Sequence, residues 1–320
     1  MQPVHSLRTI ANASEAAYGR IQDYVTKTMC LQSRGQLGVY FKTENFQKTG
    51  SFKFRGATAK LSSLGADMPV ITASSGNHGI ACSQAAITTG HELSVVLPDS
   101  VAQAKLSKIQ SFDVKTILHP GDSGLAERHA RDLAEEAGFT YVSPYNDVEI
   151  IAGQGTIGIE LLDQLLEIDN IFISLGGGGL VSGIGAVLKT ANPKIQVFGV
   201  SATHSAALAS SIRAGKVVET EHLQTLADGC AGGVDDDTIT LSLACEVIDD
   251  LIDCSEAEIV SALNSLAWEE HMIVEGAAAL AYAGYLKRKE DFKQQTSVVL
   301  LCGGNFDKPT LQPILSQKCN

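Results

Sequence analysis

The chain has 320 residues, of which 44% are hydrophobic and 19% are charged. This composition is that of a folded globular protein, and the length is enough for two domains of ordinary size. A net charge of −12 and a pI near 5.1 argue against nucleic acids and anionic membrane surfaces as partners.

The predicted strands and helices alternate along the chain. Runs rich in β-branched residues predict strands at 70–73, 93–97, 114–118, 171–175, 195–200 and 298–301. Helical composition and length predict helices at 154–166, 180–190, 256–267 and 275–286, and a further helix beginning within 74–79. We therefore expect an α/β fold of two open, twisted, mainly parallel sheets flanked by helices, divided near residue 146, with ligands bound at the carboxyl ends of the strands.

The chain shows no targeting or membrane signal. No run approaches the roughly 18 apolar residues of a membrane span, and residues 1–10 lack the order of a signal peptide, so we expect a cytoplasmic protein. The seven cysteines include no CxxC pair, which indicates neither a zinc site nor a disulfide framework.

One lysine lies in the segment TGSFKFRGA, residues 49–57. Small and apolar neighbours solvate the Lys53 ammonium poorly, which lowers the pKa of a lysine and favours the neutral amine. A neutral amine can attack a carbonyl or hold pyridoxal phosphate (PLP) as a Schiff base. Taken alone, a single lysine among glycines favours a solvated turn over a Schiff-base lysine.

Four successive glycines, Gly176, Gly177, Gly178 and Gly179, follow the predicted strand 171–175 and precede a predicted helix beginning at Leu180. A strand, a glycine turn and a helix N-terminus together form an anion site, because backbone N–H groups and the helix dipole face the ligand. The run lacks the Lys-Ser/Thr ending of a nucleoside triphosphate loop and the GxGxxG spacing of a dinucleotide site. A phosphate is therefore the expected ligand.

Two further polar motifs follow predicted strands. SSGNHG, residues 74–79, carries N–H groups and hydroxyls that could bind an α-carboxylate; alternatively Ser75 or Asn77 caps the following helix. LCGGN, residues 301–305, closes the last predicted strand. Three of the four motifs therefore follow predicted strands, and ligands in such folds bind at the carboxyl ends of the strands.

In this order, from about residue 42 to residue 305, the motifs resemble the fold-type II PLP enzymes of the serine/threonine dehydratase and serine racemase family. The resemblance implies the fold of the tryptophan synthase β-subunit, PLP as cofactor and a homodimer. It further implies a large PLP-binding domain from residues 1–68 and 147–320, a small mobile domain from residues 69–146, and no C-terminal regulatory domain.

The resemblance also assigns roles to residues. Lys53 holds PLP and removes the Cα proton, Ser75 is a second base on the opposite ring face, and Asn77 binds the 3-hydroxyl. The remaining cofactor contacts are Phe52, Gly176, Gly177, Gly178, Gly179, Leu180 and Cys302. The substrate carboxylate is surrounded by Ser74, Ser75, Asn77 and His78.

Cys302 matches the neutral residue that faces the pyridine nitrogen, which favours β-elimination over transamination. Glu275 matches a family glutamate near the cofactor and stays outside the predicted catalytic set. Two departures occur: Ile80 replaces a frequent glutamine, and the strand 195–200 is not followed by a carboxylate until Glu219. We therefore predict no metal, and read the acidic run 235–237 as a solvated turn.

The predicted function is β-elimination of a β-hydroxy α-amino acid, such as L-threonine or L-serine, to a 2-oxo acid and ammonia. One alternative is a serine or aspartate racemase. Another is a dehydratase for hydroxyaspartate or for an intermediate of hydroxyectoine catabolism. A non-catalytic sensor of PLP or amino acids is disfavoured, since a sensor needs neither Lys53 nor Ser75 as a proton-transfer group.

Overall fold

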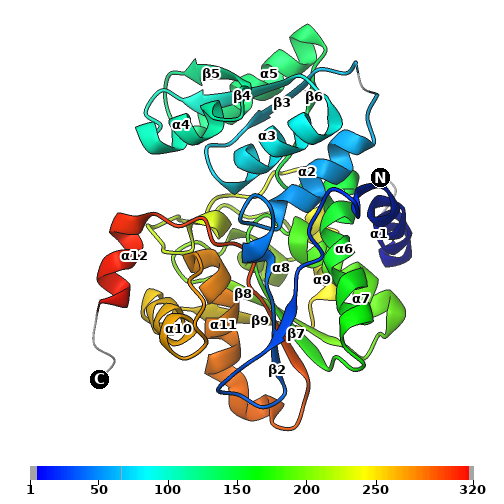
Figure 1. Ribbon diagram of the computed structural model, residues 1–320, viewed down its shortest axis with the longest axis vertical. Helices are drawn as coiled ribbons and strands as arrows, with labels where there is room; N and C mark the ends of the chain where they lie inside the picture. Colours follow the sequence, from blue (N-terminus) through cyan, green and yellow to red (C-terminus); the bar gives the residue numbers. More distant parts are fainter. Residues whose placement is uncertain (1–5, 66, 317–320) are drawn as a thin grey trace.

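The computed structural model describes residues 6–65 and 67–316, and it contains two separate sheets, each covered by helices (Figure 1). The six-stranded sheet and its helices form the lower part of the view, and the four-stranded sheet forms the upper part. The predicted fold class, two mainly parallel sheets flanked by helices, is confirmed.

The large sheet has the strand order β1-β2-β10-β7-β8-β9. Its only antiparallel pair among the described strands is β1 with β2, and all other neighbours are parallel. β10 is the last strand in the chain, yet it lies between β2 and β7. The bounds are β1 Cys30–Gln32, β2 Val39–Lys42, β7 Asn170–Ser174, β8 Gln196–Ala202, β9 Asp250–Cys254 and β10 Ser297–Leu300.

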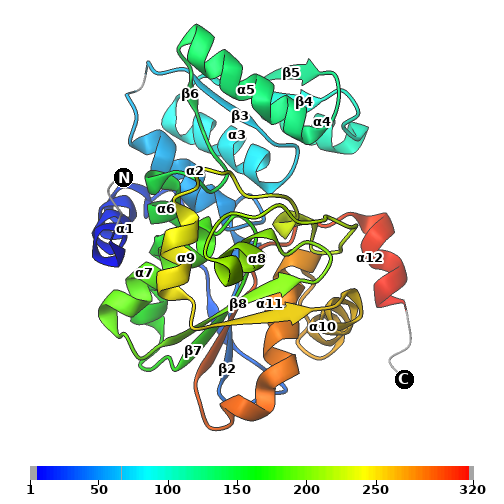
Figure 2. The ribbon, with the colours of Figure 1, turned by 180° about the vertical axis from the view of Figure 1, so that it is seen from behind.

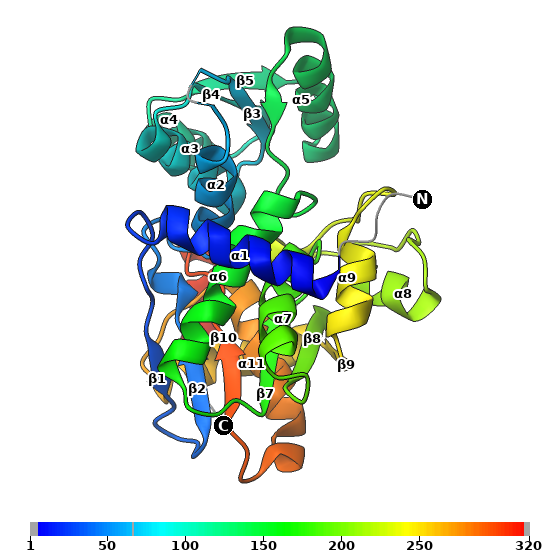
Figure 3. The ribbon, with the colours of Figure 1, turned by 90° about the vertical axis from the view of Figure 1, so that its right-hand side faces the viewer.

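Helices cover both faces of the large sheet. One face carries α1 (Leu7–Ile21), α6 (Val148–Gln164) and α7 (Gly179–Ala191), and the other carries α10 (Glu256–Trp268) and α11 (Gly276–Arg288), as Figures 1 and 3 show. α6 and α7 can approach closely because Gly183 has no side chain. A Cβ at that position would lie 2.2 Å from the Ile151 carbonyl oxygen. The interior is aromatic on the α11 side, where Phe172 stacks on Phe198 with ring centroids 4.9 Å apart.

The small sheet is wholly parallel, with the order β5-β4-β3-β6. Its two faces follow from alternation along the strands: Val70 and Val95 pack towards α3, whereas Ile71 and Val96 pack towards α5. The bounds are β3 Val70–Ala73, β4 Leu93–Pro98, β5 Lys115–His119, β6 Thr140–Tyr141, α3 Asn77–Thr89, α4 Gln103–Gln110 and α5 Ser123–Ala137.

The helix α2 (Lys53–Ser62) packs against both α3 and α6, so it lies at the junction of the two parts. A buried charge cluster, Lys42, Glu44, Arg55 and Glu160, holds it there. The Arg55 guanidinium donates to Glu44 at 2.8 Å and to Glu160 at 2.7 Å, and the Lys42 ammonium donates to the second Glu160 oxygen at 2.5 Å. Side-chain exposure in this cluster is 1% or less, so two cations and two anions compensate one another away from water.

All six predicted strands are present, with ends shifted by at most two residues. The strands β1, β2, β6 and β9 were not predicted, and neither were several helices, among them α1, α4, α5, α8 (Ala207–Ala214), α9 (Thr240–Val247) and α12 (Lys308–Leu315). The predicted helix 154–166 begins six residues early, at Val148, because Asp147 caps it by accepting from the Glu149 and Ile150 amides.

The predicted domain boundaries stay a prediction, although the strands of the small sheet all fall between Val70 and Tyr141. Within residues 6–65 and 67–316, no helix combines the length and the apolar composition that crossing a bilayer demands.

Candidate active site

Main-chain hydrogen bonds join the lysine segment to the end of β10. The Phe52 amide donates to the Cys302 carbonyl at 3.0 Å, and the Gly304 amide donates to the Gly50 carbonyl at 2.8 Å. Between these bonds, Ser51 and Gly303 form an isolated antiparallel bridge. Two motifs about 250 residues apart in sequence therefore lie side by side, with Lys53 at the first turn of α2 and Cys302 beside it.

Lys53 is held in a largely apolar environment. Its Nζ donates to the Pro144 carbonyl at 2.8 Å and lies 5.2 Å from the centroid of the Phe52 ring. Burial lowers the pKa of Lys53 from its ordinary value near 10.5 to about 8. The amine is therefore far more often neutral at physiological pH than a lysine in water, as the sequence predicts.

The thiols around Lys53 add no negative charge. Burial raises the pKa of Cys82 and of Cys230 to about 12, and raises that of Cys302 well above its ordinary value. Cys302 is 3% exposed and uncharged, which fits a neutral neighbour for a pyridine nitrogen.

Capture of PLP by the cofactor-free protein should accelerate as the pH rises to about 8 and then level off. The reason is that the neutral Lys53 amine is the attacking form, and its pKa is about 8. Stopped-flow absorbance of imine formation between pH 6 and pH 10, with Nα-acetyl-lysine as the reference amine, would measure this. A rate that still climbs at pH 10, as the reference does, would contradict the lowered pKa.

The four glycines form a cradle that side chains would fill. A Cβ on Gly177 would lie 2.4 Å from the Tyr145 ring, and one on Gly176 would lie 3.2 Å from Cys230 Cα. Gly178 has φ +88° and caps α7 without a side chain, so the first amides of the helix face the cradle rather than a capping oxygen. α7 begins at Gly179, one residue before the predicted start.

SSGNHG connects β3 to α3, as predicted, but neither Ser75 nor Asn77 caps the helix: the N-cap is Gly76, with no side-chain hydrogen bond. The Ser74 hydroxyl accepts from the Gly76 amide at 3.2 Å. The His78 ring is buried, with Nε2 3.0 Å from the Val142 carbonyl, and burial lowers the pKa of His78 to about 3. The ring of His78 is therefore a buried structural group, and the part of His78 available to a substrate carboxylate is its backbone N–H at the start of the helix.

Asn77 meets a carboxylate that was left outside the predicted catalytic set. Its side-chain amide donates to both oxygens of Glu275, at 2.9 and 3.1 Å, and the Asn305 backbone amide donates to Glu275 at 3.0 Å. Burial raises the pKa of Glu275 to about 7. Sequence reasoning also missed Asn305 as a site residue; its position directly after LCGG was the available signal.

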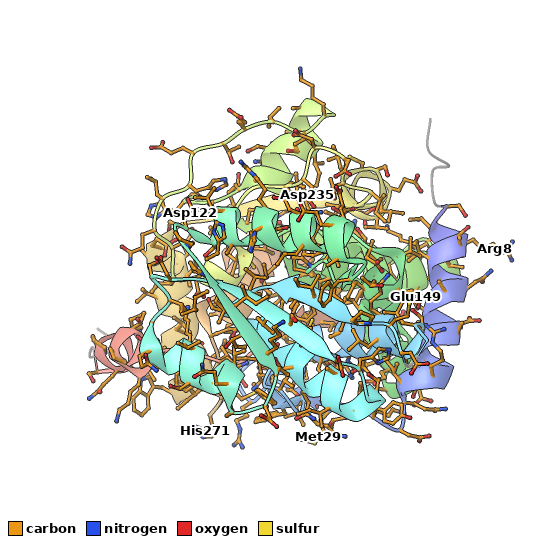
Figure 4. The ribbon with its side chains drawn as sticks, turned by 90° about the horizontal axis from the view of Figure 1, so that it is seen from above. Arg8, Met29, Asp122, Glu149, Asp235 and His271 are labelled. Carbon is orange, nitrogen blue, oxygen red and sulfur yellow. The ribbon has the colours of Figure 1, made fainter. Side chains whose placement is uncertain are left out.

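The acidic run 235–237 is more than a solvated turn, because Asp235 joins the two parts of the molecule. Its carboxylate accepts from Arg131 of α5 at 3.2 Å and from the Asn146 side chain at 3.3 Å. Its amide donates to the Tyr145 hydroxyl at 2.9 Å, and the Tyr145 ring covers the glycine cradle. Figure 4 shows Asp235 beside α5, and Figure 2 shows the chain between α8 and α9 passing along the junction.

The structure also locates the two departures from the family pattern, which are Ile80 and the absence of a carboxylate just after the strand 195–200. Ile80 is 7% exposed and packs in the apolar core that includes Phe54 and Ala81. Past the end of β8, the Ser205 hydroxyl lies 2.8 Å from His222 Nδ1 and accepts from the Gly232 amide at 3.1 Å. The described part of the chain holds no group of three or more His, Cys, Asp or Glu side chains arranged for a metal. The prediction of no metal stays a prediction.

A low-pKa lysine beside a glycine anion cradle, at the carboxyl ends of parallel strands, defines the class of α/β enzymes that bind a phosphorylated aldehyde cofactor. Comparison with known proteins names the family: a model described as "Pyridoxal-phosphate dependent enzyme" matches residues 21–303. The chain belongs to this family, and its cofactor is PLP.

Several relatives match nearly the whole chain. The catabolic L-threonine dehydratase TdcB of Escherichia coli K12 is 33% identical over 305 residues, covering 93% of this chain and 92% of that protein. The L-threo-3-hydroxyaspartate ammonia-lyase of Saccharomyces cerevisiae is 35% identical over 310 residues, covering 94% and 95%.

Solved structures agree. The processed form of threonine deaminase isoform 2 from Solanum lycopersicum superimposes with a TM-score of 0.91 at 28% identity, covering 98% of this chain and 94% of the other. Maize serine racemase gives a TM-score of 0.88 at 29% identity, covering 95% of each chain. The serine/threonine dehydratase and serine racemase resemblance is thereby confirmed.

Proposed function

We propose that this protein is a PLP-dependent ammonia-lyase that converts a β-hydroxy α-amino acid, such as L-threonine or L-serine, into a 2-oxo acid and ammonia. The observation that carries this is Lys53, a lysine with its pKa lowered to about 8, next to an uncharged Cys302. The threonine dehydratase relative at 33% identity supports the same reaction.

The residues present fit the cofactor. The cradle at 176–179 has no Cβ atoms, and a Cβ on Gly177 would lie only 2.4 Å from the Tyr145 ring. The first amides of α7 would hold the phosphate, Lys53 the aldehyde carbon, and Phe52, Asn77, Leu180 and Cys302 the ring. When bound, PLP supplies the electron sink that makes the Cα proton of an amino acid removable.

The chain's own residues would then supply binding and proton transfer. The N-terminal amides of α3, with Ser74, Ser75, Asn77 and His78, orient the substrate carboxylate. The Lys53 amine removes the Cα proton, for which its lowered pKa suits it. Cys302 gives the ring nitrogen no carboxylate partner, which favours loss of the β-hydroxyl over storage of charge on the ring.

Two alternatives have specific support. Racemisation needs a second base, for which Ser75 is the predicted residue, and the match to maize serine racemase supports racemisation as an alternative reaction. The yeast L-threo-3-hydroxyaspartate ammonia-lyase, at 35% identity, supports hydroxyaspartate as substrate. We further propose a homodimer, a small mobile domain at residues 69–146, and a large domain from residues 1–68 and 147–320.

The deciding experiment is a product assay of the PLP-loaded protein on L- and D-serine, L- and D-threonine, and threo- and erythro-hydroxyaspartate. 2-Oxo acid, ammonia and enantiomeric composition are scored together. Equal amounts of oxo acid and ammonia would establish the lyase and name its substrate. Inverted amino acid without ammonia would replace this proposal by a racemase, and no reaction across the panel would overturn both.

A further inference from the structure

Glu275 is a buried carboxylate that two other segments of the chain contact. It lies just before α11 and is 5% exposed, yet it forms no side-chain cap on that helix. It accepts instead from Asn77 at the start of α3 and from the Asn305 amide after β10. Gly303 makes room for it, because a Cβ there would lie 2.4 Å from a Glu275 oxygen.

The Glu275 carboxylate determines the orientation of the Asn77 side-chain amide, that is, which of its two ends is the nitrogen and which the oxygen. The amide nitrogen of Asn77 donates to Glu275, while its oxygen accepts from the Asn305 side chain at 2.8 Å. The Asn305 amide nitrogen is in turn anchored on the Thr49 carbonyl at 2.7 Å. A flipped Asn77 would set its oxygen against the carboxylate oxygens and lose a charge-assisted hydrogen bond.

The charges around Glu275 oppose one another. Lys53 and the two asparagine donors favour the carboxylate, whereas burial and the neighbouring Asp228 favour the protonated acid. Cys230 and Cys302, which also face it, are uncharged because burial raises the pKa of each thiol. With burial dominant, the pKa of Glu275 rises to about 7.

We propose that Glu275 is a positioning residue: it fixes which end of the Asn77 amide is the donor, so that one of the two N–H groups can bind the 3-oxygen of PLP. An amide nitrogen has two hydrogens, and Asn77 can keep one on Glu275 while offering the other. Protonation of Glu275 removes an acceptor and loosens this hold. The inference rests on the proposed function in two respects: it requires PLP at Lys53, and it requires the predicted contact of Asn77 with the 3-oxygen.

The test compares Glu275→Gln with Glu270→Gln. Glu270 is a matched control, since it is also 5% exposed and also accepts three hydrogen bonds, from Ser33, Arg34 and Gly35, none of them a predicted site residue. The readouts are the dissociation constant for PLP and the PLP absorption spectrum from pH 6 to pH 8.5, with the melting temperature of the cofactor-free protein as a folding check.

The wild type should lose PLP affinity in two steps as the pH falls, one near 8 from Lys53 and one near 7 from Glu275. Glu275→Gln should bind PLP about tenfold more weakly at pH 8 and lack the step near 7, since a charged hydrogen bond is lost. Glu270→Gln should keep both steps. A Glu275→Gln protein with the wild-type profile would overturn the proposal.

A double-mutant cycle with Asn77→Ala separates positioning from a general effect of charge. Once Asn77 is removed, Glu275→Gln should change the PLP dissociation constant no further, whereas fully additive effects would contradict the proposal. If Glu275→Gln does not fold, Asn77→Asp is used instead: it should lose PLP affinity at pH 8, and Asn77→Asp with Glu275→Gln should regain it. Failure to regain affinity would also count against the proposal.

These readouts need no turnover, so the two proposals can fail separately. A protein that binds PLP with the change in affinity near pH 7, but releases neither oxo acid nor ammonia, would contradict the proposed lyase activity. It would not contradict the role of Glu275. An active lyase whose Glu275→Gln variant still loses PLP affinity near pH 7 would contradict the role of Glu275 and leave the lyase activity unaffected.

Discussion

Replacing Lys53 by alanine should abolish the imine absorption of bound PLP and lower kcat by at least about 10³-fold. The variant loses both the amine that attacks the cofactor aldehyde and the base that removes the Cα proton, and general-base catalysis alone contributes about 10² to 10⁴-fold. Absorbance of the PLP-loaded protein and the oxo acid assay measure the two losses independently.

Lys48→Ala is the matched control, because Lys48 is exposed and lies only five residues before Lys53 in the chain. It should keep the imine band and the activity of the wild type. An imine band that survives Lys53→Ala would show that another lysine holds the cofactor, and the assignment of the site would then be wrong.

Replacing Arg55 by alanine should destabilise the protein by about 3–5 kcal/mol, the usual cost of breaking a buried ion pair by removing one partner. Arg55 is fully buried and lies between Glu44 and Glu160, so its removal leaves Lys42 as the one cation of the cluster to balance two carboxylates. The loss should appear in urea unfolding of the cofactor-free protein as a lower midpoint with a similar slope.

Arg213→Ala provides the comparison. Arg213 pairs with Asp253 at 2.8 Å, but the two side chains are 46% and 38% exposed. An exposed pair contributes about 1 kcal/mol or less, so this variant should unfold close to the wild type. Equal effects of the two substitutions would mean that burial does not govern the strength of these pairs.

Six strands, β3, β4, β5, β7, β8 and β10, were predictable because each contains a short run rich in β-branched or apolar residues. β9 was missed because Asp250–Cys254 is an edge strand with a polar, part-buried pattern rather than an apolar one. β1 and β6 are only three and two residues long, too short for any periodicity to register. β2 was missed although Val39, Tyr40 and Phe41 all favour strands.

Site residues were predictable where the neighbouring residues in the sequence determine their chemistry, as they do for Lys53 and the four glycines. It was not predictable where the partner is remote. The hydrogen bond between Asp235 and Arg131 joins residues 104 apart in the sequence, and that between Asn77 and Glu275 joins residues 198 apart. No local pattern specifies such pairs, because the fold alone decides which loops meet.

The position of β10 has a consequence for how this protein is made. The strand that completes the centre of the large sheet is the last to be synthesised, and the segment that closes on Gly50 and Phe52 comes immediately after it. Lys53 can thus emerge from the ribosome long before its surroundings exist. A nascent chain that ends before residue 305 lacks the segment that closes on Gly50 and Phe52, so the pocket can be completed only after residue 305 has been synthesised.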